Sequence, residues 1–432
     1  MLNGLEEVKG GICTKTIDFN NDTRRVSAGW LLLLGLTAMF ALLYLISTLF
    51  PGRIDPSVTK YFSIALAEKA RIYNFVPRIL YIIQFCLQTV LFCWLLFSSG
   101  GRTFFQRIRK LSRHYWLITA LSILGVWLLS KLVSLPFSYY SGYYWQKIWG
   151  FSTQTPAAWW IDYLKNAGIE LLISLAGGLV FFLLVNRLSR YWWLAGASLF
   201  SIWLVVEYFL WPIVVSPLFN HFEPVPNSAV VSMVDDLAHR AGLNVGAVLV
   251  MDASKQTTLA NAYFTGLGTT KRIVIYDTLL RNYSLPEIKA VIAHEMGHWR
   301  HNDVIHGLWY GMAGGFFVFG LLTFLLKPWL PKNSKKQPQL WVALQLAVIL
   351  LLFVSSPLQN AISRQMEINA DHFSLELTGN LPAEIRLQED LARNNLADLS
   401  PPGFIVWFSY DHPPALTRIQ ALVQEYSQGI NR

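Results

Sequence analysis

The amino-acid sequence predicts a mainly α fold: a polytopic helical membrane protein of about seven transmembrane helices, with a small α+β domain after the fifth. Composition favours this class. Hydrophobic residues make up 53% of the 432 residues and charged residues only 14%, against roughly 25% charged residues in soluble domains. The apolar residues also form long blocks, since residues 26–50 and 79–101 contain no charge. Each block is long enough to span a bilayer.

Five further segments are candidate spans, each shortened or interrupted by an ionisable residue or a short charge-free core. They are 115–146, with a span expected to end near Lys131, then 171–186 beside Glu170, 191–215 around Glu207, 304–326 and 340–358. Ionisable residues within spans usually face the bundle interior or water. Lys131, Glu170 and Glu207 therefore indicate a polar cavity, although Glu170 could equally reach the interface at the end of its span.

The distribution of charge indicates what the protein contacts, and the cysteine spacing indicates whether it forms a disulfide. The net charge is +9, but the basic residues gather beside apolar blocks, as between Arg102 and Arg113. This pattern is typical of contact with lipid headgroups, so the expected partner is the lipid bilayer and not nucleic acid. Cys86 and Cys93 are seven residues apart in an apolar block, about 10 Å along a helix and beyond disulfide reach. The first 25 residues do not resemble a signal peptide.

Residues 223–303 are soluble in composition and show clear periodicity. A helix is predicted over 227–241, closed by Gly242. Strands are predicted over 245–251, 262–265 and 272–276, with Gly266 and Gly268 in a turn before the last. Ser284 and Glu287 then form a capping box at the start of another helix. The expected organisation is an N-terminal tail (1–25), a five-helix membrane region (26–222), the α+β domain (223–303), two spans (304–358) and a C-terminal segment (359–432).

The capped helix carries His294-Glu295-Met296-Gly297-His298. Residues four apart on a helix share a face, so the two imidazoles can bind one metal ion, which zinc favours. Glu295 lies about 100° round the helix, where it can reach a water on the metal as a general base. Gly297 lets another chain segment approach closely. A random chain would show this pattern in roughly one case in a hundred.

A catalytic zinc site usually has three protein ligands. On an unbroken helix His301 lies about 10 Å from His294 and Asp303 points away, so the third ligand should come from another segment. Glu367 and Asp371 lie four apart on a predicted helix after the seventh span. One of them could bind zinc and the other could accept the outer N–H of a histidine. The alternative is a solvated helix end with Arg364 paired to a carboxylate.

Four motifs in this order resemble one known family: Asn261 to Gly266, His294 to His298, Ser363 to Asp371, and His412-Pro413-Pro414 followed by Arg418. The family comprises the membrane zinc metalloproteases of the Ste24 type, the CAAX prenyl endopeptidases and their bacterial relatives. The motifs cover about residues 220–425, and the predicted spans match the family's layout. The resemblance implies a zinc-dependent metalloendopeptidase whose α+β domain is the metalloprotease domain.

The resemblance also implies roles for individual residues. Glu367 would be the third ligand of one Zn²⁺ ion, beside His294 and His298, and Asp371 its companion. His412 would stabilise the oxyanion and Arg418 would order the carboxylates near the metal. The residues of one strand would pair with an extended substrate by β-augmentation: Asn261, Ala262, Tyr263 and Phe264. Asp411 stands where the family often has Ser or Asn, and would raise the proton affinity of His412.

The expected function is an integral-membrane zinc endopeptidase that cuts a membrane-associated peptide or protein, or a CAAX-like C-terminus. One alternative is a transporter or channel with an incidental metal site, in which Glu207 would matter more than Glu295. Another is an inactive, chaperone-like relative, against which the intact Glu295 argues. The expected location is a bacterial inner membrane. The short segments between the predicted spans carry 15 Lys and Arg on one side of the membrane and 7 on the other. The positive-inside rule would then place the metalloprotease domain outside. In eukaryotic relatives, by contrast, the catalytic side faces the cytosol.

Overall fold

The computed structural model describes residues 27–266, 271–330 and 338–429. The expected N-terminal tail (1–25) therefore lies outside the described residues. The same holds for Gly268 of the predicted turn and for most of the basic segment 327–337.

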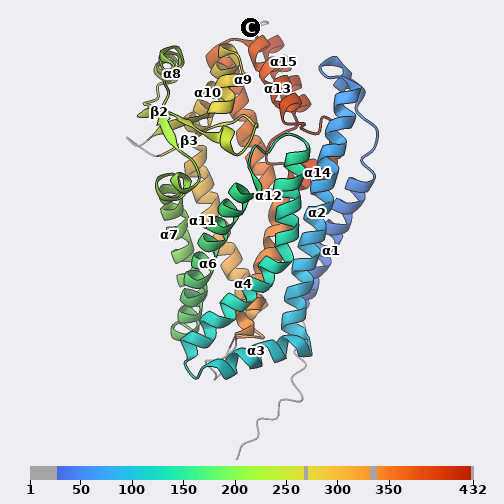
Figure 1. Cartoon of the computed structure of the whole chain (residues 1–432), viewed down its shortest axis with the longest axis vertical. Helices are drawn as coiled ribbons and strands as arrows, with labels where there is room; N and C mark the ends of the chain where they lie inside the picture. Colours follow the sequence, from blue (N-terminus) through green and yellow to red (C-terminus); the bar gives the residue numbers. More distant parts are fainter. Residues whose placement is uncertain (1–26, 267–270, 331–337, 430–432) are drawn as a thin grey trace, which may run out of the picture.

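Seven helices of the described chain are long and apolar enough to cross a membrane, which confirms the predicted fold class. They run side by side as a bundle with a small α+β domain at one end (Figure 1). Helices satisfy their backbone hydrogen bonds internally, as a bilayer requires. The seven are α1 (Ala28–Leu49), α2 (Ile64–Phe97), α4 (Tyr115–Tyr139), α6 (Pro156–Arg187), α7 (Trp192–Leu210), α11 (Asp303–Leu326) and α12 (Gln339–Thr378).

The sequence predicts that the third span ends near Lys131, but the third of these helices, α4, continues beyond this residue. α4 continues through Pro136 to Tyr139. Lys131 forms an ion pair with Glu170 of α6 and lies 6.0 Å from the Trp127 ring centroid. An ion pair between two membrane helices costs less than two isolated charges. Short helical segments connect the spans: η1 (Pro56–Lys60), η2 (Tyr140–Tyr144), α5 (Trp145–Ile148), η3 (Trp211–Val215) and η4 (Ser216–Leu218).

At the other end of the bundle, α3 (Ser99–Leu111) lies across the spans (Figure 1). Its apolar face is packed into the bundle, with Phe105 fully buried and Ile108 8% exposed. The turn from α2 into α3 requires glycine, because a Cβ at Gly101 would lie 2.2 Å from the carbonyl oxygen of Leu95. The amphipathic α3 is therefore held firmly against the membrane helices.

The α+β domain contains a four-stranded sheet in the order β1-β2-β4-β3. β2 and β4 are parallel, and β1 and β3 add antiparallel at the two edges. The three predicted strands are present, and β1 is additional. Their bounds are β1 (Phe222–Pro224), β2 (Ala247–Met251), β3 (Ala262–Thr265) and β4 (Arg272–Tyr276).

Helices of the domain pack on this sheet. α8 (Ser228–Ala241) ends at Gly242, whose φ of 67° is the left-handed conformation that glycine favours. η5 (Ala253–Lys255) and α9 (Asp277–Asn282) flank the strands. α10 (Leu285–Arg300) begins with the predicted capping box of Ser284 and Glu287. Its fully buried face joins Ile273 and Ile275 of β4 in one core.

One of the membrane helices extends beyond the bundle into this domain. α12 is 40 residues long and passes through Pro357 without ending, so the seventh span runs directly into the α+β domain. The chain then folds back over the end of α12 and α10 in α13 (Leu381–Asn394), α14 (Gly403–Ser409) and α15 (Ala415–Gly429). The residues at the end of α12 are thus enclosed by elements far apart in sequence.

Candidate metal centre

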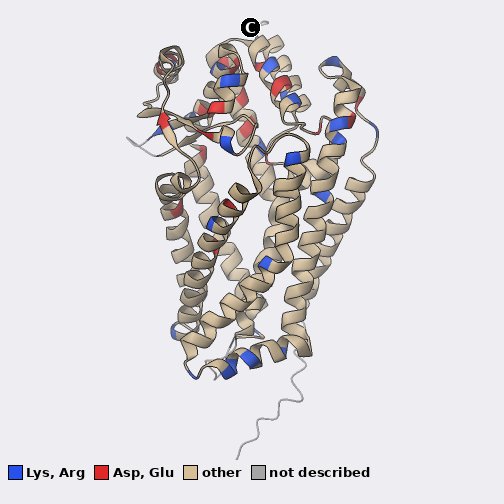
Figure 2. Ribbon diagram, in the orientation of Figure 1, with Lys and Arg blue, Asp and Glu red and all other residues tan. Residues whose placement is uncertain are grey.

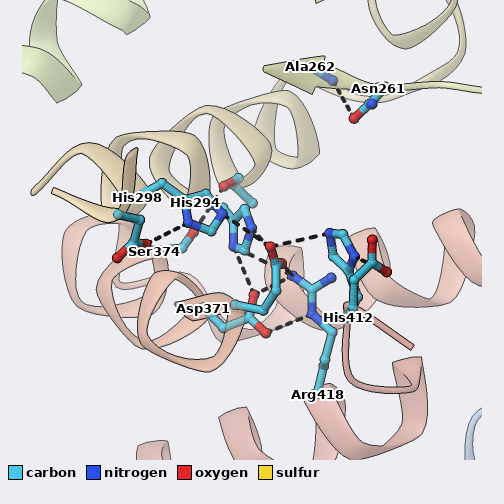
Figure 3. Close-up of polar contacts among 12 residues, drawn as sticks. Asn261, Ala262, His294, His298, Asp371, Ser374, His412 and Arg418 are labelled. Carbon is cyan, nitrogen blue, oxygen red and sulfur yellow. Dashed lines mark hydrogen bonds and ion pairs between the residues drawn. The ribbon is translucent and has the colours of Figure 1, made fainter. Parts of the chain in front are cut away.

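Two helices bring three potential metal ligands together. α10 supplies His294 and His298, one turn apart, and α12 supplies Glu367. Their ligand atoms lie within 4.8 Å of one another. The two imidazoles lie close together on α10, on the side that faces Asp371 and Arg418 (Figure 3). This is the only such group of three His, Cys, Asp or Glu side chains within the described ranges.

The close approach of α10 and α12 depends on small residues. A Cβ at Gly297 would lie 2.9 Å from Cα and 3.1 Å from the carbonyl oxygen of Ala370. The Ser374 hydroxyl joins the same helices, with its Oγ 2.9 Å from the carbonyl oxygen of Ala290 and 2.6 Å from Oε1 of Glu384. Backbone cannot move aside as a flexible side chain can. Glycine at position 297 thus allows the α12 carboxylate to lie beneath the two imidazoles.

The outer nitrogen of each histidine contacts a carboxylate. His294 Nδ1 lies 3.0 Å from Asp371 Oδ1, and His298 Nδ1 lies 2.8 Å from Asp303 Oδ2. Such partners hold the ring proton on Nδ1 and leave the Nε2 lone pair for a metal. The two Nε2 atoms indeed face Glu367, at 3.2 Å from Oε2 and 3.3 Å from Oε1.

Glu367 fits the role of a third ligand. Its side chain is 8% exposed. Its Oε2 atom is buried and has no hydrogen-bond partner, because His294 Nε2 at 3.2 Å does not meet hydrogen-bond geometry. A buried carboxylate oxygen without a donor is costly, and a cation would satisfy it. Two imidazole nitrogens and one carboxylate form a donor set typical of catalytic zinc.

The charges around the site shift several pKa values. Burial favours the neutral ring of each histidine, but the carboxylate contacts outweigh burial and raise the pKa of His294 to about 9 and that of His298 to about 10. Burial raises the pKa of the Glu295 carboxyl, and the two imidazoles counter part of this effect. A carboxylate with a raised pKa is a better proton acceptor near neutral pH.

Asp303 contacts His298 and does not point away from it, so the prediction from an unbroken helix is wrong. α10 ends at Arg300, and Asn302 adopts a left-handed conformation with φ of 55°. The chain therefore turns, and Asp303 becomes the first residue of α11 beside His298. The Asn302-Asp303 pair is itself a signal for this break, because asparagine tolerates the left-handed region and aspartate favours helix starts.

The C-terminal segment brings two further predicted residues to the cluster. His412 Nε2 lies 3.3 Å from Glu367 Oε1, and its Nδ1 lies 2.9 Å from Asp411. The contact with Asp411 raises the pKa of His412. Arg418 donates two hydrogen bonds to Asp371, from Nε at 2.7 Å and from Nη2 at 2.5 Å (Figure 3). Arg418 thus fixes the carboxylate that contacts His294.

The expected substrate strand lies at a sheet edge. β3 pairs with β4 on one side, and no strand of the described chain pairs with its other side. Ala262 is buried and the Phe264 ring packs 3.8 Å from the Trp299 ring centroid on α10. These two side chains therefore face the domain core, while Tyr263 lies on the opposite face. Asn261 Oδ1 accepts from the Ala262 N–H at 2.9 Å (Figure 3).

Trp299 was not singled out from the sequence. Besides contacting Phe264, its ring lies 4.0 Å from Lys271 Nζ. It couples α10, which carries His294 and His298, to the sheet edge. A tryptophan next to a histidine carries no sequence signal for this contact, which depends on the register of β3 against α10.

Comparisons with known proteins match both halves of the chain. The model of peptidase family M48 matches residues 224–426, and that of the CAAX prenyl protease N-terminal region, described as five membrane helices, matches residues 51–221. An uncharacterised metalloprotease of Bacillus subtilis, YhfN, is 32% identical over 384 residues, which cover 86% of this chain and 88% of the relative. CAAX prenyl protease 1 of Saccharomyces cerevisiae is 30% identical over 319 residues, covering 68% of this chain and 69% of that protein.

A solved structure shares the fold. The crystal structure of S. mikatae Ste24p superposes with a TM-score of 0.77, covering 90% of this chain and 97% of that one at 23% identity.

Proposed function

This chain belongs to peptidase family M48 and is an integral-membrane zinc metalloendopeptidase; on that premise we propose that His294, His298 and Glu367 hold one zinc ion. One observation carries the assignment. The outer nitrogens of both imidazoles are occupied by carboxylates, so their inner nitrogens converge on the third carboxylate. A zinc ion bound there would polarise a water molecule and the scissile carbonyl.

Glu295 is proposed as the general base. It follows His294 on α10, on the side of the helix next to the ligand face, and burial raises its pKa. It would take a proton from the attacking water and pass it to the leaving amine nitrogen, so the carboxylate is regenerated in each turnover.

His412 is proposed to donate a hydrogen bond to the oxyanion of the tetrahedral intermediate. Its imidazole is next to Glu367 and 55% exposed on the open side of the cluster. The contact with Asp411 raises its pKa and favours the protonated, donating form. A positioned donor of this kind stabilises the developing negative charge. Arg418 would act indirectly, since it holds Asp371 in place.

The free edge of β3 is proposed as the site that aligns a substrate. Backbone groups of residues 261–264 could pair with an extended peptide. The side chains of Ala262 and Phe264 are packed inward, so this strand would contribute register and little side-chain selectivity. Such a surface suits an enzyme that accepts several sequences.

The proposed substrates are membrane-associated peptides, with CAAX-like C-termini as one candidate class because several relatives are named CAAX prenyl proteases. The proposed location is a bacterial inner membrane. Lys and Arg line α3 at the end of the bundle opposite the carboxylate-rich domain (Figure 2). No Asp or Glu occurs between residues 69 and 161, so phospholipid headgroups would neutralise this face.

The test is membrane proteomics of cells with the wild-type enzyme, with Glu295→Gln and with Glu376→Gln, an exposed glutamate on α12. We expect Glu295→Gln to retain zinc, to lose about 10²- to 10⁴-fold in rate and to accumulate intact substrates. Glu376→Gln should behave as wild type. Farnesylated and unmodified CAAX peptides would then distinguish the substrate class.

Three results would count against parts of this proposal. Equal substrate profiles for wild type and Glu295→Gln would remove the general-base role. Absence of zinc from purified wild type would remove the metal assignment. A loss of function with Glu207→Gln but not with Glu295→Gln would favour the transporter alternative.

A further inference from the structure

The imidazole of His412 is more than half exposed, so its position depends in part on its backbone. The side chain is 55% exposed, and its two nitrogen contacts are with Glu367 and the adjacent Asp411. Such an exposed ring has few neighbours to hold it. Its placement therefore depends on how firmly the loop between α14 and α15 is anchored.

Tyr410, two residues before His412, is held at both ends. Its carbonyl oxygen accepts a hydrogen bond from Arg364 Nη1 of α12 at 2.6 Å. Its hydroxyl oxygen accepts one from Arg78 Nη2 of α2 at 2.7 Å. Burial raises the pKa of Tyr410 to about 12, so this hydroxyl stays neutral. Two membrane helices, α2 and α12, thus each donate a hydrogen bond to Tyr410.

Arg78 is an unusual residue for a buried position on a membrane helix. Its side chain is 10% exposed, and Nη1 pairs at 2.8 Å with Asp398, whose side chain is 2% exposed. Asp398 is itself oriented by the backbone N–H of Ser400 at 3.1 Å. A buried guanidinium is costly unless its donors are satisfied in good geometry. In Arg78, Nη1 donates to the Asp398 carboxylate and Nη2 donates to the Tyr410 hydroxyl.

We propose that Arg78, on the second membrane helix, is a positioning residue for catalysis: with Asp398 it holds Tyr410, and through Tyr410 it holds His412 beside the metal cluster. This inference rests on the oxyanion role proposed above for His412. Arg78 would act at a distance, since it forms no ion pair or hydrogen bond with His294, His298 or Glu367 in the described structure.

A purely structural role is the competing explanation, because any buried ion pair can hold a fold together. The two explanations differ in what they predict. A positioning role requires that the effect on rate disappears once the imidazole is removed. A structural role requires that stability or zinc content changes and that the effect on rate is independent of His412.

The test compares Tyr410→Phe, which removes only the hydroxyl, with Arg78→Met and Arg78→Lys. Tyr73→Phe is the matched control, because Tyr73 lies on α2 like Arg78 and its hydroxyl also makes a hydrogen bond, to Gln146 Oε1 at 2.8 Å. Cleavage of fluorescein-labelled β-casein, a flexible polypeptide, gives kcat and KM in detergent. Zinc content and thermal unfolding are measured on the same samples.

We expect Tyr410→Phe to lower kcat about tenfold, because displacements near 1 Å at a reacting group cost up to about 10²-fold. KM and zinc content should not change. Arg78→Met should cost as much or more, and Arg78→Lys, which can still donate to one partner, should recover part of the loss. Tyr73→Phe should match wild type.

A double-mutant cycle with His412→Ala decides the matter. In the His412→Ala background, Tyr410→Phe should have almost no further effect on kcat, since the group that it positions is gone. Multiplicative losses would overturn the inference while leaving the function of His412 intact. If His412→Ala alone leaves kcat unchanged, the proposed oxyanion role fails instead. If Arg78→Met does not fold, the same cycle stands on Tyr410→Phe.

Discussion

Replacing Asp303 with alanine should weaken zinc binding about 10- to 100-fold. The carboxylate lies 2.8 Å from His298 Nδ1 and is 9% exposed, so water does not readily replace it. Without it the imidazole is free to rotate and to move its proton to Nε2, the atom that faces Glu367. The expected loss corresponds to about 1.4–2.7 kcal/mol of binding free energy. Asp303→Asn keeps an acceptor oxygen and should lose less than about tenfold.

The assay is competition for zinc between the purified protein and a chromogenic chelator, with metal content measured separately. Asp277→Ala is a close control, because Asp277 is also 9% exposed and is also the first residue of a helix, α9 of the α+β domain. It contacts Ser254 and Arg281 and not a histidine. Asp277→Ala should therefore affect stability without a specific loss of zinc affinity.

Two results would refute the reasoning. If folded Asp303→Ala binds zinc as tightly as wild type, then the contact does not orient His298. If Asp277→Ala loses as much affinity, then the loss reflects the stability of the domain and not the partner of the imidazole.

Three further changes test the packing and charge around the cluster. Gly297→Ala should separate α10 from α12, because its Cβ would meet the Ala370 backbone at 2.9 Å; thermal unfolding should show a cost of about 1–3 kcal/mol, with weaker zinc binding. Burial raises the pKa of Glu384 above its ordinary 4.5, so the stability that its neutral form provides is present at low pH and lost as pH rises through the folded-state pKa. Glu384→Gln should therefore unfold like wild type near pH 4 and at a higher temperature than wild type near pH 8. Removing zinc with a chelator should lower the unfolding temperature of the wild type, since a ligand that binds only the folded state stabilises it, and added zinc should restore it.

The features that sequence reasoning identified are those that depend on neighbours within a helical turn or two. The capping box of Ser284 and the paired histidines of α10 are of this kind. Glu367 was recognisable only as one of two carboxylates, and its assignment over Asp371 came from a family resemblance. A helix that continues past Asn302 predicts the wrong direction for Asp303, because Asn302 takes a left-handed conformation and ends that helix.

Long-range contacts leave no such local signal. Arg78 is separated by 320 residues from Asp398 and by 332 from Tyr410. In sequence it is simply a basic residue next to the charge-free block 79–101. Its partners become apparent only when α2, the segment after α13 and the loop after α14 are brought together by the fold.

The membrane helices therefore do more than anchor a protease domain. The α+β domain contributes His294 and His298, but the carboxylates around them belong to membrane helices: Asp303 begins α11, and Glu367 lies near the end of α12. α12 is continuous from the bundle to the cluster. Successive residues of a helix are about 100° apart, so a shift of one residue at a break in α12 would turn Glu367 away from the two histidines. The same logic explains why Gly297 matters: the site exists only where two rigid helices touch backbone to backbone. Helices α11 and α12 of the bundle thus set the positions of the carboxylates around His294 and His298, and these contacts also hold the α+β domain against the bundle.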